Sequence, residues 1–444
     1  MTNIDMRLLT LESVRRELDT QSRSRLADAV PRWAASGAMS LTGNADGPPD
    51  TSPAVIAPRV DALASGVADA AGAIGRRVEI DGLALLGERA AIAGLTRQGS
   101  MSVGGAARMV ASADGWLALN LARPEDIASV PALVGSAIDP NNRDSVAEAV
   151  AARPTDELIE MATLLGLPLA AVPTTLRSAP VAPWQLLHVA SQRSPRRRPP
   201  LVIDLTSLWA GPLAGSLVAA AGARVIKVEG ENRPDGTRAG PRDFFDLLNS
   251  GKEMVALDFG NREDRARLRG LLESADLVLE GSRPRVMDAL GIDPRKLAEN
   301  GVSWISITGH GRNGAAANRV AFGDDAAVAG GLFVAGAPPR FVADAVADPI
   351  AGLAAALVAL TLLAGEHCAV VDVPLSRAAA WARGNETLPH VAVEQCRDDQ
   401  SDHVSWIVDD DLRSVVRSPR HRTPTTRAAP LGANTAEVLP LLRN

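Results

Sequence analysis

The second half of the chain contains short apolar runs that alternate with stretches of helical character. The runs span residues 201–206, 224–229, 255–258, 277–280 and 304–308. Apolar runs of this length are typical of strands buried on both faces of a sheet. Helical stretches between them, such as residues 211–221 and 262–274, predict an α/β fold with a parallel, doubly wound, Rossmann-like sheet. In such a sheet the carboxyl ends of the strands share one edge, where ligands bind.

The composition limits the number of domains and excludes some classes of function. A chain of 444 residues exceeds one ordinary domain, so we expect two or three. The formal net charge of −6 argues against a nucleic-acid-binding protein, because contact with a phosphate backbone needs an excess of Lys and Arg. The cysteines are Cys368 and Cys396, without a CxxC or Cys/His cluster, so neither a disulfide scaffold nor a bound metal is expected.

Residues 349–365 carry no charge and approach the lower limit of about 17–25 residues for a membrane span. They are rich in Ala and Gly and lack basic or aromatic flanks, which favours a buried helix over a membrane helix. The N-terminal residues mix charges early and lack the apolar core of a signal peptide. We therefore expect a cytoplasmic protein.

Two stretches rich in Gly, Pro and polar residues suggest domain boundaries. The expected parts are an N-terminal helical segment and linker (residues 1–58), a smaller α+β domain (59–190), a second linker (191–200) and the sheet domain (201–444). The small domain should contain a hairpin whose turn is Asp114-Gly115. The arginines of the second linker are expected to face solvent, with a phosphate contact as the alternative.

Asp348 stands directly before the uncharged stretch. A carboxylate at the start of a mostly buried helix is in a position to act as a nucleophile. It is equally suited to cap the helix, since Pro349 after it is a favoured first helical residue. Asp344 is a competing candidate nucleophile. The residues alone leave these interpretations open.

Several polar residues follow the predicted strands, at the edge where a ligand is expected. They are Asn249, Lys252, Arg283, Gly309 and His310. The chain has no GxGxxG and no GxxxxGK[ST] motif, so neither a dinucleotide site nor a P-loop is supported. Any one of these residues alone is most simply a surface residue. Their shared position at strand ends favours a ligand site.

This set of segments, in this order, resembles the class III coenzyme A transferases, which include formyl-CoA transferase, carnitine CoA-transferases and α-methylacyl-CoA racemases. The matching stretches are residues 202–206 with 210–212, 222–229, 249–252 with 255–258, 283–287 and 307–311. Residues 347–352 (ADPIAG) resemble the family segment that bears the catalytic aspartate. The resemblance therefore implies that Asp348 is the nucleophile.

The resemblance also implies a mechanism. The carboxylate attacks an acyl-CoA thioester to give a mixed acyl-aspartyl anhydride, and the released thiolate converts this anhydride to an aspartyl-CoA thioester. An acceptor acid then reverses the sequence. Coenzyme A is thus a substrate, no cofactor is held permanently, and the implied partner is a second copy in a homodimer. The residues implied to contact CoA are Trp209, Asn249, Lys252, Arg283, Gly309 and His310.

The order of the parts departs from the family pattern, in which the small domain follows the catalytic aspartate. Here residues 98–105, 108–116 and 155–168 resemble small-domain features but precede residue 200. We therefore expect a rearranged chain, which leaves the interlocking of a dimer open. Gly99, Gly104 and Gly105 belong to a loop that the resemblance places over the aspartyl intermediate, with an ordinary turn as the alternative.

The sequence leaves two alternative functions. Racemases of the family carry a Gly-His-Asp tripeptide whose His moves a proton, whereas residues 321–325 read AFGDD. Racemisation needs such a base and is therefore disfavoured. The rearranged order also leaves open a catalytically silent CoA-binding protein.

Overall fold

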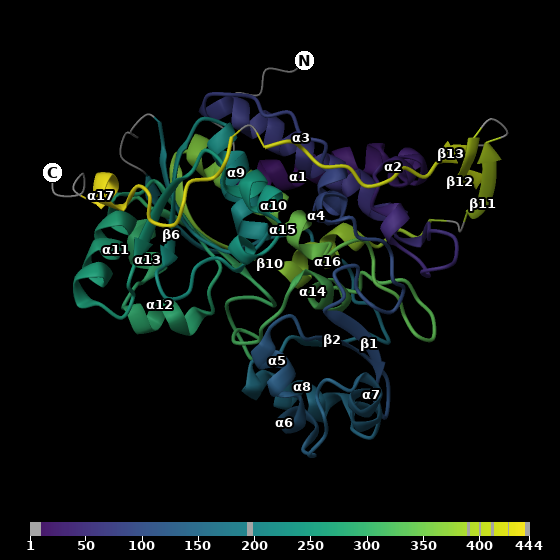
Figure 1. The fold of residues 1–444 in the computed structure, drawn as a ribbon. Coiled ribbons are helices and arrows are strands. Elements are labelled where there is room, and N and C mark those ends of the chain that lie inside the picture. The colour runs from purple at the N-terminus through teal and green to yellow at the C-terminus, as the bar shows by residue number, and fades with distance from the viewer. Residues whose placement is uncertain are drawn as a thin grey trace.

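The computed structural model describes residues 10–192, 199–388, 391–398, 401–409, 413–424 and 426–439. A large unit is built around a seven-stranded sheet. A small unit, residues 107–171, contains a three-stranded sheet and lies below the large unit in Figure 1. A third sheet near the C-terminus, formed by β11 (Ala392–Asp398), β12 (Ser401–Asp409) and β13 (Ser414–Val415), projects from one side.

The large sheet contains every strand expected from the apolar runs. These are β5 (Leu201–Leu205), β6 (Arg224–Gly230), β7 (Glu253–Leu257), β8 (Leu277–Glu280) and β9 (Ser303–Thr308). Two further strands, β4 (Gln185–Gln192) and β10 (His367–Pro374), extend one edge, and the order is β4-β10-β9-β8-β5-β6-β7. All neighbours pair in parallel except β4 with β10. The expected α/β class with a parallel sheet is confirmed.

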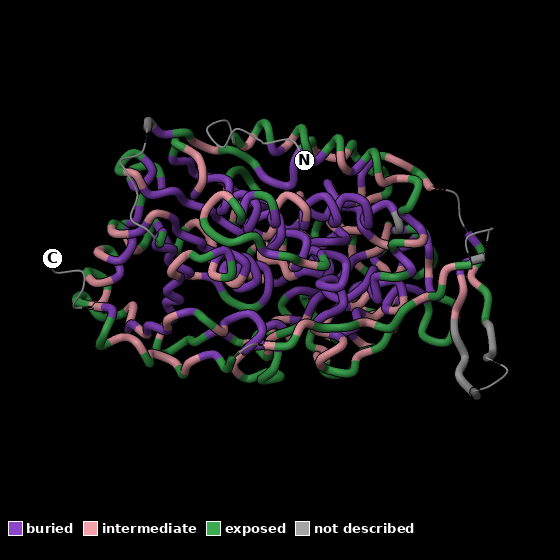
Figure 2. The backbone as a smooth tube through the Cα atoms, turned by 90° about the horizontal axis from the view of Figure 1, so that it is seen from above, coloured by how far each residue is buried: buried purple, intermediate pink, exposed green. Residues whose placement is uncertain are grey.

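Helices cover both faces of this sheet, which explains why its strands read as unbroken apolar runs. Along β5, Val202 faces one core and Leu201 and Ile203 face the other, as the two-residue period of a strand requires. The buried residues lie in the middle of the large unit and the exposed residues at its rim (Figure 2). The helices outside the small unit are α1 (Leu11–Ser24), α2 (Ala29–Ala35), α3 (Ile56–Ile74), α4 (Glu88–Ala93), α9 (Ala210–Ala220), α10 (Arg242–Asn249), α11 (Arg262–Ser274), α12 (Pro284–Leu290), α13 (Pro294–Glu299), α14 (Gly323–Ala329), α15 (Ala347–Ala364), α16 (Leu375–Arg383) and α17 (Thr435–Val438).

Helix α15 is the centre of one core and packs against α3, α9 and α16. By length and composition it resembles a membrane span, but 89% of it is buried inside the structure. The expected buried helix is thus confirmed. Its small residues allow close packing: a Cβ added at Gly352 would lie 2.7 Å from the carbonyl oxygen of Ala210.

The N-terminal part belongs to the large unit. In the N-terminal segment and linker expected over residues 1–58, the helical character appears as α1 and α2, and residues 1–9 lie outside the described residues. The linker is only partly correct. Helix α3 begins at Ile56, and Met39 and Leu41 are buried. The Gly- and Pro-rich composition hid these apolar side chains: Met39 packs into the core around α15, and Leu41 packs in a small cluster with Ala90 and Val103.

The small unit has a core of its own, built on the expected hairpin of β1 (Ala107–Ala111) and β2 (Trp116–Asn120). Strand β3 (Leu169–Ala171) pairs with β2. The unit's helices are α5 (Pro124–Ala128), α6 (Val130–Val134), α7 (Arg143–Ala151) and α8 (Thr155–Leu165). The region expected as a small domain, 59–190, also contains most of α3 and β4, both of which pack in the large unit. Of the second predicted linker, residues 193–198 lie outside the described residues.

Candidate active site

Asp348 is the second residue of α15, whose N-cap is Val346, so the interpretation of Asp348 as the N-cap is wrong. Its side chain is partly exposed and accepts a hydrogen bond from the backbone N–H of Gly323, at the start of α14. A Cβ added at Gly323 would lie 2.5 Å from Oδ2 of Asp348. A glycine at position 323 is therefore what lets this carboxylate approach the backbone.

Two further acids and one arginine surround Asp348, and we call these four residues the acid cluster: Arg89, Asp324, Asp344 and Asp348. Arg89 comes from α4, and its Nε lies 2.9 Å from Oδ2 of Asp344, while its Nη2 lies 2.5 Å from Oδ1. The Asp344 side chain is fully buried and Asp324 is 6% exposed. The cluster holds three carboxyl groups against one guanidinium.

The turn before α15 is conformationally strained. Ala343 and Ala345, on either side of Asp344, have φ angles of 51° and 44°. Residues other than glycine adopt this left-handed region at a cost of about 1–2 kcal/mol. Remote side chains hold the turn: Thr42 Oγ1 accepts from the Ala343 N–H at 3.0 Å, and Asp324 Oδ1 accepts from the Ala345 N–H at 3.0 Å. Such strain persists where surrounding contacts fix it, often beside a functional group.

Burial makes two acids of this cluster, Asp324 and Asp348, hard to ionise. It raises the pKa of Asp348 to about 7, against the opposing charge of Arg89 and with a further rise from Asp324 and Asp344. Burial, followed by the charge of Asp344, raises the pKa of Asp324 to about 6. The carboxyl group of Asp348 therefore gains and loses its proton near neutral pH.

The glycine loop, residues 99–105, reaches the acid cluster within one chain. A Cβ added at Gly104 would lie 3.0 Å from Nη2 of Arg89, and the Ser102 side chain hydrogen-bonds to Asp324. Gly99 and Gly105 have φ angles of 69° and 78°, where glycine is favoured. The loop is fixed at its start because the Phe341 N–H donates to the Gly99 carbonyl oxygen at 3.0 Å.

Trp209 lies beneath Arg89 rather than in an open CoA pocket. It is 2% exposed, and the guanidinium carbon of Arg89 lies 5.3 Å from the centroid of its ring. Phe244 packs edge-on against the same ring, with centroids 5.2 Å apart. Trp209 therefore forms a wall of the acid cluster.

Lys252 and Asn249 do not face the expected phosphate. Lys252 Nζ donates to Asp204 Oδ2 at 2.8 Å, to the Pro212 carbonyl oxygen at 2.9 Å and to Asn249 Oδ1 at 3.1 Å. Asn249 is fully buried and donates to the Phe245 carbonyl oxygen. An ammonium group has three N–H bonds, and all three are used here. The structure therefore does not support a phosphate contact for either residue.

These residues belong to a second buried group, which we call the lysine cluster: Asp204, Lys227, Asp235 and Lys252. Lys227 Nζ donates to the Thr206 carbonyl oxygen at 2.7 Å and lies 2.9 Å from Asp235 Oδ2. Burial alone would raise the pKa of Asp204, but the charges of Lys252 and Lys227 hold that pKa below its ordinary value. Two cations thus face two anions.

Arg283 remains the best placed residue for an anion. It stands at the N-cap of α12 and lines a cavity of about 220 Å³ between the two units, together with Arg123, Arg285 and Gly166. Partial burial, followed by the charges of Arg285 and Arg123, lowers the pKa of Arg283. Among the described residues it forms no ion pair with a carboxylate.

Gly309 and His310 follow β9 as predicted. Gly309 is needed for packing, because a Cβ there would lie 2.9 Å from Cβ of Ala321. Burial lowers the pKa of His310 to about 3, so its imidazole is neutral. Its Nε2 is buried and has no hydrogen-bond partner within the described part of the chain. No group of three or more His, Cys, Asp or Glu side chains suited to a metal ion occurs among the described residues.

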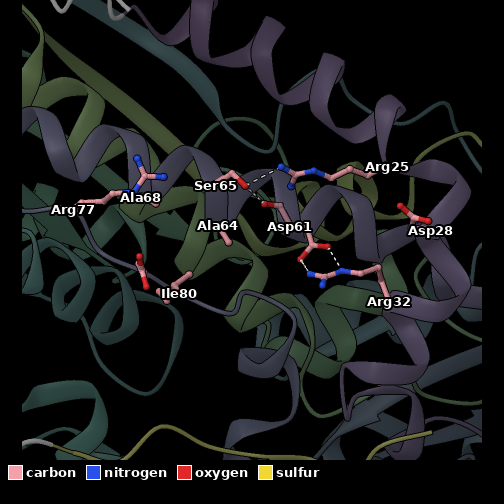
Figure 3. Close-up of a pocket in the computed structure, with 10 residues that line it drawn as sticks. Arg25, Asp28, Arg32, Asp61, Ala64, Ser65, Ala68, Arg77 and Ile80 are labelled. Carbon is pink, nitrogen blue, oxygen red and sulfur yellow. Dashed lines mark hydrogen bonds and ion pairs between the residues drawn. The ribbon is translucent and has the colours of Figure 1, made fainter. Parts of the chain in front are cut away.

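A larger hollow of about 480 Å³ lies elsewhere, beside α2 and α3 (Figure 3). Arg32 makes two hydrogen bonds to Asp61 there, at 2.7 and 2.6 Å, and Arg25 donates to Ser65 Oγ at 3.1 Å. None of the predicted site residues lines it. The hollow is therefore not the candidate site.

Sequence reasoning missed Arg89 and Asp324. No local pattern marks Arg89, because its partner Asp344 lies 255 residues later in the chain. Asp324 lies in the AFGDD stretch, where the resemblance points to a missing histidine and not to an acid. The second acidic residue of that stretch, Asp325, lies 2.9 Å from Asn120 Nδ2, which donates to its Oδ1.

Residues 200–409 match the family model described as CoA-transferase family III. An acetyl-CoA:oxalate CoA-transferase of Acetobacter aceti is 32% identical over 166 residues, covering 34% of this chain and 43% of the relative. A succinyl-CoA–D-citramalate CoA-transferase of Chloroflexus aurantiacus is 30% identical over 189 residues, covering 39% and 47%. The chain thus spans less than half the length of these two curated relatives.

Solved structures give weaker matches. A CAIB/BAIF family protein from Brucella suis aligns with a TM-score of 0.41 at 24% identity, covering 47% of this chain and 65% of that one. A hypothetical protein from Mycobacterium tuberculosis aligns with a TM-score of 0.37 at 27% identity, covering 42% and 57%.

Proposed function

We propose, because residues 200–409 match CoA-transferase family III, that the chain moves coenzyme A between an acyl-CoA thioester and a carboxylic acid. The observation that carries this proposal is the carboxylate of Asp348. It lies beside a backbone N–H donor, at the start of a buried helix, and its proton is lost near neutral pH. A nucleophilic carboxylate needs these conditions.

The proposed reaction consists of two displacements with the acyl donor and two with the acceptor acid. An oxygen of Asp348 attacks the thioester carbonyl carbon, the C–S bond breaks, and an acyl-aspartyl anhydride and a CoA thiolate result. The thiolate then attacks the aspartyl carbonyl carbon of the anhydride, which releases the donor acid as a carboxylate and leaves aspartyl-CoA. The acceptor carboxylate repeats these steps in reverse, so that a new acyl-CoA leaves and Asp348 is regenerated.

The surroundings of Asp348 suit these intermediates. An anhydride is readily hydrolysed, and the packed core around α15 limits the access of water to it. The Gly323 N–H is a fixed donor within reach of the carboxyl oxygens, where charge changes during attack. We propose that the glycine loop covers this intermediate, since it already contacts Arg89 and Asp324.

We propose a doubly wound, Rossmann-like arrangement for the large sheet. The strand order β10-β9-β8-β5-β6-β7 supports it, because chain order runs outward in both directions from the β5–β8 pair. Ligands of such sheets bind outside the carboxyl ends of the strands at this reversal. Arg283, which follows β8, would then hold a CoA phosphate through charge-assisted hydrogen bonds.

A racemase on the same scaffold is the second candidate. The observation that favours it is the pair of protonatable carboxyl groups, Asp324 and Asp348, whose pKa values are raised to about 6 and about 7. Two such groups suit proton removal and return at a carbon beside a thioester. Deuterium uptake from solvent at the α-carbon of a 2-methylacyl-CoA, without transfer of its CoA to another carboxylic acid, would favour this function.

We also propose a homodimer in which each of the two active sites is formed by residues of a single chain. The support is that the glycine loop, Arg89 and Asp348 meet within a single subunit. The small unit would then have no need to reach across the dimer.

The test is a screen of donor and acceptor pairs by mass spectrometry. Acetyl-CoA and succinyl-CoA are suitable donors, because the names of the two relatives described above mention them. With an active pair, Asp348→Asn should lose at least about a thousandfold in kcat/KM, since the nucleophile is gone. Asp325→Asn, an equivalent change at a neighbouring buried acid, should retain activity.

Hydroxylamine gives a second readout, because it converts an anhydride or thioester of Asp348 to a hydroxamate at that residue. Transfer activity that survives in Asp348→Asn would contradict the mechanism. CoA binding without transfer to any acceptor would instead indicate a catalytically silent binding protein.

A further inference from the structure

We propose that Arg89 is the positioning residue of this site: by holding Asp344 it fixes the strained turn that presents Asp348 at the start of α15. The proposal rests on the proposed function only in taking Asp348 as the nucleophile. Arg89 lies outside the region that matches the family, so no role there passes to it by similarity.

The contacts of Arg89 fix its position on three sides. Its two hydrogen bonds to Asp344 form a planar fork, which holds a carboxylate in orientation as well as in place. Its guanidinium lies over the ring of Trp209, and Gly104 of the glycine loop approaches its Nη2. A side chain fixed in this way is a rigid support for Asp344.

The turn that Arg89 supports lies directly before the nucleophile. Thr42 and Asp324 hold the backbone N–H groups of Ala343 and Ala345, and Arg89 holds the side chain between them. Without Arg89, Asp344 would be a buried carboxylate with no cation to pair with, which is strongly destabilising in that position. The turn would relax, and Asp348, four residues later, would move with it.

Arg89 also sets the charge state of the nucleophile. The charged groups that face Asp348 are Arg89, Asp324 and Asp344, and Arg89 has the largest effect of the three. A neighbouring positive charge favours the ionised carboxylate and lowers its pKa. Removing the guanidinium therefore raises the pKa of Asp348 and moves the ionised, reactive form to higher pH.

The experiment compares Arg89→Met, Arg89→Lys and the control Arg32→Met. Arg32 also forms a two-bond pair with an aspartate, Asp61, but lies in the separate hollow of Figure 3. The pKa of Asp348 is measured by carbon NMR of the protein with labelled aspartate, and the signal is assigned by its loss in Asp348→Asn. The pH dependence of kcat/KM is measured in parallel.

Arg89→Met should raise the pKa of Asp348 by on the order of one unit and shift the acidic limb of the pH profile equally. Arg89→Lys keeps the charge but loses the fork, so the pKa should stay near that of the wild type while kcat falls about 10- to 100-fold. Arg32→Met should change neither quantity.

An unchanged pKa and unchanged kcat in Arg89→Met overturn the proposal. Should Arg89→Met fail to fold, a kcat equal to wild type in Arg89→Lys overturns it instead. A wild-type protein inactive with every donor would defeat the proposed function, while the NMR titration would still decide whether Arg89 controls Asp348.

Discussion

The acid cluster and the lysine cluster are both buried, but they differ in charge balance. The lysine cluster sets two ammonium groups against two carboxylates, and its acids keep lowered pKa values. The acid cluster sets one guanidinium against three carboxyl groups, and two of its acids have raised pKa values. Asp204 and Asp324 are both buried, yet the pKa of Asp204 is lowered and that of Asp324 is raised, so burial is not the difference. Unmatched charge distinguishes the acid cluster from the lysine cluster.

The largest expected effect on stability comes from removing one positive charge of the lysine cluster. Lys252→Met leaves Asp204 buried with one fewer cation, so the free energy of unfolding should fall by about 3–5 kcal/mol. Urea unfolding measures this change. Lys296→Met, on the exposed side of α13, is the matched control and should have little effect.

A double variant tests whether the unpaired charge of Asp204 causes this loss of stability. Lys252→Met combined with Asp204→Asn removes both charges of the pair, so it should recover part of the lost stability. A Lys252→Met protein of normal stability but weakened CoA binding would show that Lys252 contacts the ligand after all.

The next effect concerns Asp325, next to the acid cluster. Asn120 Nδ2 donates to Asp325 Oδ1, while Asp325 Oδ2 and Asn120 Oδ1 are buried without partners in the described part of the chain. Burial raises the pKa of Asp325 to about 7, so below that pH the side chain is a neutral acid with an O–H group to donate. The folded protein holds this proton more tightly than the unfolded chain.

Stability should therefore fall as the pH rises from the ordinary value of 3.8 to about 7. Asp325→Asn supplies a permanent N–H donor and removes this dependence. At pH 8 it should be more stable than wild type by about 1–3 kcal/mol, because a buried unpaired acceptor has gained a partner. Unfolding curves at pH 5 and pH 8 measure the difference, and an equal change at both would contradict the interpretation.

The smallest effect tests the strained turn of the acid cluster. Ala345→Gly should stabilise the protein by less than about 1 kcal/mol, because glycine adopts a positive φ without the penalty of a Cβ. A modest loss of kcat should accompany it, since the turn becomes less restrained. Ala347→Gly, the same change at the first residue of α15, should instead destabilise by about 0.5–1 kcal/mol. Equal effects of the two changes on thermal unfolding would exclude a role for strain.

Sequence patterns predicted the strands, the hairpin and α15 because these depend on local periodicity and turn residues. The contacts of Lys252 with Asp204, Pro212 and Asn249 could not be predicted, because similarity fixes a position in the chain but not the direction of a side chain. The N-terminal start of α3 was hidden, since its apolar residues follow a Pro- and Gly-rich stretch. The place of Arg89 in the acid cluster could not be predicted from the sequence, because its partner Asp344 lies in the other half of the chain.

The pairing of β4 with β10 and the packing of α3 on α15 have a consequence for how the chain could be divided. Everything up to the end of β4 supplies Arg89 and the glycine loop, and everything from the start of β5 supplies Asp348. A gene divided between these two strands would yield two polypeptides, one with Arg89 and the other with the three acids of the acid cluster. Their reassembly could then be followed as the return of the proposed CoA-transfer activity, which makes this protein suited to study as two separately produced pieces.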